Sequence, residues 1–122
     1  MGVVVIKNIL IAKDVAKARE DYEFYIKVTA DIENGIVAIG GEYHADAEKI
    51  LIEEEKSRSK NIWGGGYNIQ TKNFETNAII NLRPGINDSM EIVDPEVRKR
   101  YIELVENKLK KIQETIVHKR KN

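Results

Sequence analysis

Residues 24–39, FYIKVTADIENGIVAI, decide the fold because they hold two strand patterns joined by a tight turn. From Phe24 to Ile32, aliphatic and other apolar residues alternate with Tyr, Lys, Thr and Asp. This period of two predicts a strand with one buried and one solvent-facing side. Asn34-Gly35 follows, a pair that favours a hairpin turn because both residues tolerate positive φ. Residues 36–39 are then the return strand.

On the N-terminal side of this hairpin, the sequence predicts a strand and a short helix. Residues 3–10 are apolar enough to form a strand. Residues 15–20 are rich in helix formers, and Asp14 is the expected N-cap.

On the C-terminal side, apolar residues at helical spacing predict a helix over 42–56. Residues 62–67, with three consecutive glycines, are expected to form a loop, and 76–83 and 90–93 to form two strands. Asp94-Pro95 is a strong helix start, with Asp as N-cap and Pro at the first helical position. One apolar stripe continues from there to Ile116, which predicts a single long helix whose distal end frays or packs on a second copy.

The resulting order, β-α-β-β-α-β-β-α, predicts an α+β fold. We expect a largely antiparallel mixed sheet with helices packed on one face, arranged as in ferredoxin-like folds with an added C-terminal helix. Residues 1–118 are interpreted as a single domain and 119–122 as a basic tail.

Composition narrows the classes of function. The 122 residues carry 20 basic and 20 acidic side chains, and this balance argues against a nucleic-acid-binding protein. There is no cysteine, which excludes disulfides and thiolate chemistry. The N-terminal apolar run is too short for a membrane span and lacks the features of a signal peptide, so we expect a soluble, cytoplasmic protein. Abundant Lys, Glu and Ile fit a thermophile or an AT-rich genome.

The first candidate site lies at the junction between the return strand and the next helix. A helix start favours anions and lowers the pKa of a nearby imidazole, so we expect His44 to be neutral. His44 shares a helix face with Glu48, as Glu42 does with Asp46. The set suits acid/base catalysis by His44, Glu42 and Asp46, or a divalent metal held by His44 and Glu48. Alternatively, the carboxylates only complement the helix dipole while His44 packs or caps.

The second candidate site is a polar cluster with ligand-binding potential. Arg83 precedes a Pro-Gly turn, and an arginine can bind a carboxylate or phosphate in bidentate fashion. The cluster consists of Asn81, Arg83, Asn87, Asp88, Ser89 and Glu91. The alternative is a turn stabilised by Asn and Asp side chains, with Arg83 in a salt bridge to Glu91.

Trp63 and the three glycines after it form the third candidate. Glycines permit close approach of a ligand to the backbone, and Trp63 could close a cleft or simply anchor the core. The P-loop, nucleophile-elbow, dinucleotide-binding and His-Glu-x-x-His motifs are all missing from the sequence.

Several segments in this order are similar to a known family. They are IKV at 26–28, DIE at 31–33, GGEYHAD at 40–46, NIWG at 61–64, INLRP at 80–84 and SMEIVDP at 89–95. Together they resemble a small prokaryotic family, domain of unknown function family 5674, from Ile26 to about Val105. The family usually has Leu at the position of Tyr43, and residues up to Asp21 match less well. The resemblance implies no activity, but it marks as residues to test Glu42, His44, Asp46, Arg83, Ser89 and Glu91.

Two hypotheses of function follow from these observations. In the first, the clusters meet in one polar cleft that binds an anionic small molecule or a divalent metal, with hydrolysis as one reaction it could support. In the second, the chain is a non-catalytic interaction module, which associates with itself or another protein through the C-terminal helix or the edge strand at 3–10.

Overall fold

The computed structural model describes the backbone of residues 2–120 and the side chains of residues 2–116. It confirms the predicted hairpin: β2 (Tyr25–Asp31) pairs antiparallel with β3 (Ile36–Ile39). Asp31 Oδ1 accepts hydrogen bonds from the N–H groups of Glu33 and Asn34, and Gly35 has a φ of +69°. The local sequence therefore builds this turn as expected.

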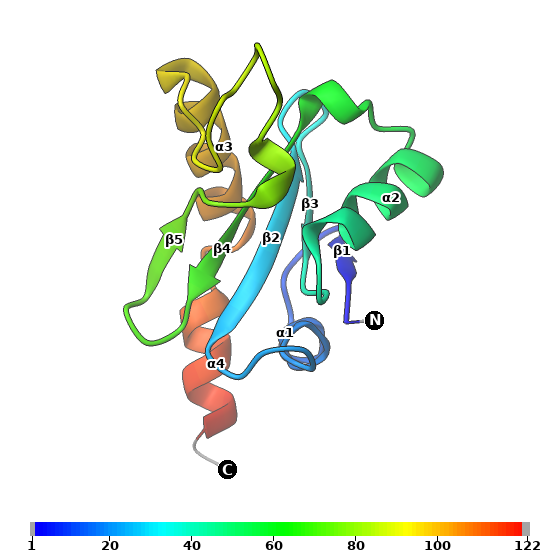
Figure 1. The fold of residues 1–122 in the computed structure, drawn as a ribbon. Coiled ribbons are helices and arrows are strands. Elements are labelled where there is room, and N and C mark those ends of the chain that lie inside the picture. Colours follow the sequence, from blue (N-terminus) through cyan, green and yellow to red (C-terminus); the bar gives the residue numbers. More distant parts are fainter. Residues whose placement is uncertain (1, 121–122) are drawn as a thin grey trace.

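Within residues 2–120, five strands form one antiparallel sheet in the order β1-β3-β2-β4-β5 (Figure 1). The outer strands, β1 (Val4–Ile6) and β5 (Asn73–Glu75), are short. β4 (Ile62–Asn68) pairs with β2 along its whole length. The prediction of a loop at 62–67 is therefore wrong, and the three glycines lie in a strand at the middle of the sheet.

Helices cover both faces of the sheet, so α+β is confirmed but the prediction of one covered face is wrong (Figure 1). α1 (Ala12–Ala18), α3 (Pro95–Lys108) and α4 (Ile112–Arg120) pack on one face with Ile26 and Val28 of β2. α2 (His44–Glu55) packs on the other through Ala47 and Leu51. Thr29, on the supposed solvent face of β2, is consequently buried. Because all strand pairs are antiparallel, the ferredoxin-like arrangement, which needs parallel neighbours, is also wrong.

Two N-cap residues were predicted; Asp94 is confirmed and Asp14 is wrong. Asp94 caps α3 as expected, because its Oδ1 accepts the N–H groups of Glu96 and Val97. α1 instead begins after Ile11, and Asp14 bonds back to the N–H of Ile11 from within the helix.

The apolar stripe of the C-terminal region lies on two helices rather than one, because the helix breaks between Lys108 and Ile112. The break lets Leu109 and Ile112 join the core with Tyr101, and these side chains are fully or almost fully buried. The stripe therefore packs within its own chain. Lys121 and Asn122 of the expected basic tail lie outside the described residues.

The segment from Thr76 to Val93 contains no regular strand, contrary to prediction. It includes a 3-10 turn, η2 (Ile79–Asn81), and is held to itself by an isolated bridge between Asn77 and Glu91. We refer to residues 76–93 as the polar arch. Side-chain hydrogen bonds replace strand pairing here, which is why strand periodicity misled the prediction. Among the described residues, no helix has both the length and the apolarity needed to cross a membrane.

Candidate functional site

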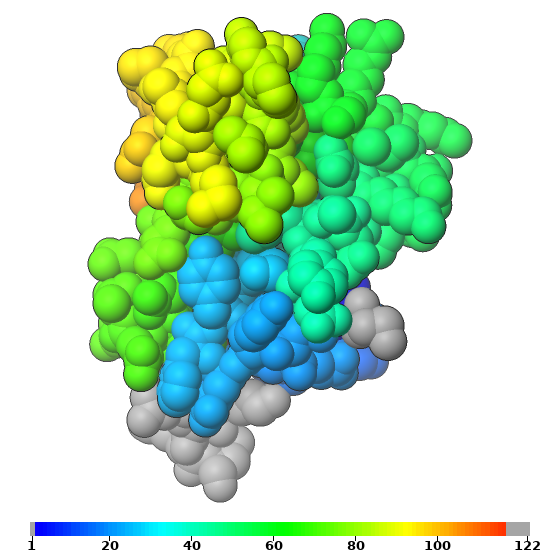
Figure 2. Space-filling view, in the orientation of Figure 1, coloured from blue at the N-terminus to red at the C-terminus, as the bar shows by residue number. Residues whose placement is uncertain are grey.

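A pocket of about 800 Å³ opens on the α2 face of the sheet. Figure 2 shows this face, where the segment at the start of β2, the start of α2 and the polar arch meet. β2 contributes Tyr25 and Lys27, and the start of α2 contributes residues 43–45. The remaining lining residues are Glu75, Asn77, Ala78, Ile79, Ile80, Met90 and Glu91.

Lys27 supplies the positive charge of the pocket. Its Nζ lies 4.8 Å from the centroid of the Tyr22 ring and 5.8 Å from that of Tyr25. Burial lowers the pKa of Lys27. The ion pairs among the side chains of residues 2–116 do not include it. A partly buried ammonium without a carboxylate partner is costly unless something else, such as an anion, pairs with it.

Tyr25 forms the floor between Lys27 and the edge of the sheet. Its ring lies over Gly66, where a Cβ would collide with the phenol. Burial, together with the charge of the neighbouring Glu75 carboxylate and a hydrogen bond to it, raises the pKa of Tyr25 to about 12. The phenol therefore stays protonated and offers a flat, neutral surface at physiological pH.

His44 lies at the inner wall and is buried. Its Nε2 is 2.6 Å from the carbonyl oxygen of Gly65, so Nε2–H donates this hydrogen bond. Burial lowers the pKa of His44 to about 4, and the charge of Lys27 lowers it as well. The expected neutral imidazole is confirmed, although burial rather than the helix start is the main cause.

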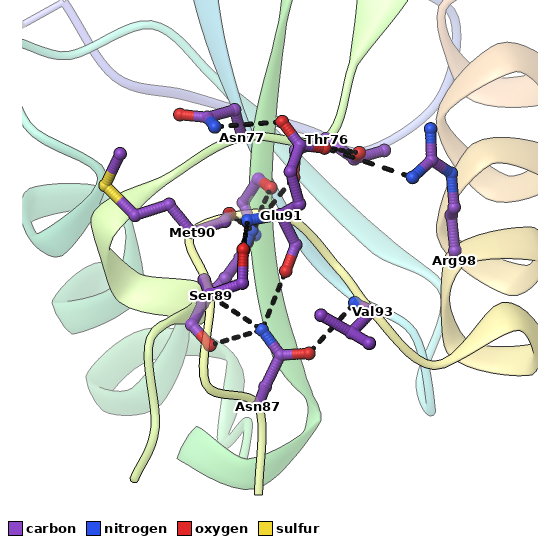
Figure 3. Close-up of polar contacts among 10 residues, drawn as sticks. Thr76, Asn77, Asn87, Ser89, Met90, Glu91, Val93 and Arg98 are labelled. Carbon is purple, nitrogen blue, oxygen red and sulfur yellow. Dashed lines mark hydrogen bonds and ion pairs between the residues drawn. The ribbon is translucent and has the colours of Figure 1, made fainter.

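Glu91 lies where the polar arch meets the pocket (Figure 3). Its carboxylate accepts hydrogen bonds from Thr76 Oγ1 at 2.8 Å and Asn77 Nδ2 at 2.9 Å, and Arg98 is 3.9 Å away. The hydrogen bonds from Asn77 and Thr76 lower the pKa of Glu91. The alternative salt bridge from Arg83 to Glu91 is wrong, because Glu91 pairs with Arg98.

Asn87 and Ser89 stabilise the polar arch from within (Figure 3). Asn87 Nδ2 donates to the carbonyl oxygens of Ser89 and Glu91, and its Oδ1 accepts the N–H of Val93. Ser89 Oγ accepts the N–H of Glu91. These contacts agree with the alternative of a turn stabilised by its own side chains.

Asn81 is fully buried and substitutes for a neighbouring strand. Its Oδ1 accepts the N–H of Gly64 at 2.8 Å, and its Nδ2 donates to the Gly64 carbonyl at 2.9 Å. The same Nδ2 also bonds the carbonyls of Thr76 and Met90. The side chain thus continues the pairing of β4 where β5 ends, since β5 reaches only to Gly66.

Arg83 holds the start of β4 in place through hydrogen bonds to the backbone. Its guanidinium donates to the carbonyl oxygens of Ser59, Lys60 and Ile62, and its Cζ lies 4.4 Å from the centroid of the Trp63 ring. Trp63 itself is buried in the core. Neither residue lines the pocket, so their proposed meeting with His44 in one cleft is not supported by the pocket lining.

The three carboxylates that are close to His44 in the sequence do not form a site with it. Glu42 and Asp46 are exposed at the start of α2, and Glu48 accepts a hydrogen bond from Ser59 Oγ at 2.9 Å. None of the three lines the pocket. Across the side chains of residues 2–116, no group of three or more His, Asp or Glu residues is placed to hold a metal ion.

The sequence did not mark several polar residues of the pocket, among them Tyr25, Lys27, Glu75 and Asn77. The signal was present in part, since Tyr25 and Lys27 alternate with buried residues on β2. This alternation predicted only that Tyr25 and Lys27 face away from the core. That a helix and the polar arch enclose this face depends on contacts far along the chain.

Comparison with known proteins adds a family but no activity. Neither the curated proteins nor the solved structures that were searched contain a match. A family of proteins of unknown function, DUF5674, matches residues 4–109, which is most of the chain. The chain therefore belongs to the DUF5674 family.

Proposed function

We propose that the chain binds a small anionic molecule in the pocket between α2 and the polar arch. The observation that carries the proposal is Lys27, a partly buried ammonium that lines an 800 Å³ pocket and has no carboxylate partner among the described side chains. A carboxylate or phosphate bound there would supply the missing charge.

The start of α2 supports an anion at the same place. His44 and Ala45 line the pocket, and no side chain caps the first turn of this helix. The N–H groups of an uncapped helix start attract negative charge, and they add to the field of Lys27. His44 is held neutral by burial, so it adds no charge of its own to this field.

The proposal is for binding rather than catalysis. His44 already uses Nε2 to bond Gly65, and Glu42 and Asp46 lie outside the pocket. The acid/base roles of these three residues therefore stay predictions. A cysteine-free chain without net charge supports a cytoplasmic location and argues against a nucleic acid as partner.

The test is an amide NMR titration with hexanoate and with phenyl phosphate. We expect shifts concentrated at Lys27, His44 and residues 77–80, and a loss of affinity of about tenfold in Lys27→Met, which keeps the length of the stem but removes the charge. Lys49→Met, on the exposed surface of α2, is the matched control and should bind like the wild type. Shifts that fall elsewhere, or equal binding by both variants, would refute the proposal.

A second candidate function is a protein-interaction module, favoured by one observation. The polar arch exposes large apolar side chains, with Ile79 75% and Ile86 78% accessible. Others on the arch are Leu82, Met90 and Val93. Exposed apolar side chains gathered on one segment suit a partner surface, including a second copy of this chain.

Light scattering over a concentration series tests this candidate. Self-association through the arch predicts a dimer that Leu82→Ser with Ile86→Ser converts to a monomer. Substitution at the edge strand, Val4→Lys, serves as the comparison because the edge strand β1 is another surface open to a second copy. A wild-type monomer at all concentrations would remove self-association as the function.

A further inference from the structure

The pocket contains a second charge without a counter-charge, the carboxylate of Glu75. Two carboxylates line the pocket, and they differ in their hydrogen-bond and ion-pair partners. Glu91 receives hydrogen bonds from Thr76 and Asn77 and has Arg98 nearby. Glu75 receives a long hydrogen bond, 3.4 Å, from Asn68 Nδ2 and a hydrogen bond from the neighbouring Tyr25 hydroxyl, but it takes part in none of the ion pairs of residues 2–116.

The register of the sheet places Glu75 and Lys27 in one row of paired residues that runs across the strands. Lys27 pairs with Gly66, and Gly66 pairs with Glu75, so the three residues form a row across β2, β4 and β5. Directly paired residues point to the same face, and with strands about 4.8 Å apart the outer two α-carbons are separated by roughly 10 Å. Gly66 leaves the middle of the row without a side chain, and the Tyr25 ring lies there instead.

The pocket is therefore divided by charge. One end holds the ammonium of Lys27 and the start of α2, the other holds the carboxylate of Glu75, and the Tyr25 ring lies between them. The walls above this floor include Ile79 and Met90, which are apolar. A carboxylate with free acceptor positions favours a hydrogen-bond donor, above all a cationic one.

Resting on the proposed function, we infer that the ligand is a zwitterion, with its anionic group at Lys27, an amine or other cationic group at Glu75, and an apolar linker over Tyr25. An ω-amino carboxylate is the simplest molecule with this pattern. A purely anionic ligand would leave Glu75 without a cationic partner and close to negative charge. A ligand with both groups satisfies both ends and matches the apolar middle.

The experiment compares three molecules of one chain length on the intact protein: 6-aminohexanoate, hexanoate and hexylamine. A shorter and a longer ω-amino acid, each with its matched carboxylate, test other distances between the two charged groups. We expect an ω-amino acid to bind about tenfold more tightly than the matched carboxylate, because it gains a charged hydrogen bond at Glu75. Calorimetry measures the affinities, and amide NMR shifts locate the binding.

Variants separate the two ends of the pocket. Glu75→Gln should abolish the advantage of the amino acid over hexanoate, because the amine loses its charged partner, and Lys27→Met should weaken both ligands. Glu53→Gln, exposed on α2, is the matched control. The comparison of the three molecules on the wild type tests the inference even if Glu75→Gln disturbs β5.

The possible failures are distinguishable. Lys27-dependent binding of hexanoate with no gain from the amine in any chain length would overturn the zwitterion inference and leave the anion pocket standing. An equal loss of hexanoate and 6-aminohexanoate in Glu75→Gln would also overturn it, since Glu75 would then act only on the structure. No binding by any of the carboxylates at the pocket would overturn both proposals.

Discussion

Lys27 and Glu75 stand on the same face of the sheet, on either side of Gly66, because β2 and β5 both pair with β4 at that glycine. The two residues are 48 positions apart in the chain, and neither is in an ion pair among the described side chains. Two opposite charges are thus held apart by the spacing of strands. A ligand, rather than either residue, is suited to bridge them.

Gly66→Ala should be tolerated better than Gly65→Ala. At Gly66 a Cβ meets the end of the Tyr25 side chain, which can move, whereas at Gly65 it meets the backbone carbonyl of Glu75 and the buried Tyr101 hydroxyl. We expect a loss of about 1 kcal/mol in the free energy of unfolding for Gly66→Ala and about 3 kcal/mol for Gly65→Ala.

Urea denaturation of the two variants measures this difference. Gly66→Ala should also weaken ligand binding, because the displaced Tyr25 ring would occupy the pocket. Equal stability losses would show that the Tyr25 ring is as fixed as the backbone of β5.

His44 should make stability depend on pH between its two pKa values. Its pKa in the folded chain is about 4, below the 6.5 of an exposed histidine. The unfolded chain therefore binds more protons in this range, and stability rises with pH from about 4 to about 6.5. The contribution is complete above that range and is lost as the pH falls, by at most about 3 kcal/mol.

Urea unfolding at several pH values, with His44→Gln as the comparison, isolates this effect. The glutamine amide can still donate a hydrogen bond but does not titrate. The difference in stability between the wild type and His44→Gln should shrink or reverse in favour of the variant at low pH. A difference that is constant with pH would contradict the assignment.

Asn81→Ala should destabilise the protein by about 3 kcal/mol or more, because the buried N–H and carbonyl of Gly64 both lose their partner. Asn73→Ala, exposed on β5, is the matched control and should change stability by less than about 0.5 kcal/mol. Hydrogen exchange of the Gly64 amide gives a local readout, and unchanged protection in Asn81→Ala would show that this N–H has another partner.

Arg83→Lys should cost about 1–2 kcal/mol of stability despite the conserved charge. Lysine cannot donate in a fork to the carbonyls of Ser59, Lys60 and Ile62 while stacking on Trp63. Trp63 is the only tryptophan, so its fluorescence should report the loss directly. Arg58→Lys, at an exposed position, should leave both stability and fluorescence unchanged.

Local signals made part of this fold predictable. The strand β2, the Asn34-Gly35 turn and the Asp94 cap each depend on residues a few positions apart, and all three formed as expected. Local signals failed where side chains replaced backbone pairing. Residues 76–83 alternate like a strand, yet Asn81 turns inward to bond β4, and the segment becomes an arch.

The candidate site was likewise predicted only in part. The sequence marked His44 and Glu91, and both line the pocket. It also marked Arg83, Asn81 and Asn87, whose hydrogen-bonding capacity is used to hold the backbone. Polar side chains that build a turn and those that bind a ligand have the same composition, so their roles separate only when their partners are known.

By itself, the sequence determined the α+β class, the β2–β3 hairpin and the start of α3, because short-range backbone preferences and periodicity are enough to set them. Only the tertiary structure decided that Gly64–Gly66 belong to a strand, that α2 covers the second face, and that Lys27 and Glu75 share a pocket. Each of these depends on strand register and burial between distant segments. Such contacts form when the whole chain packs, and no single stretch of sequence encodes them.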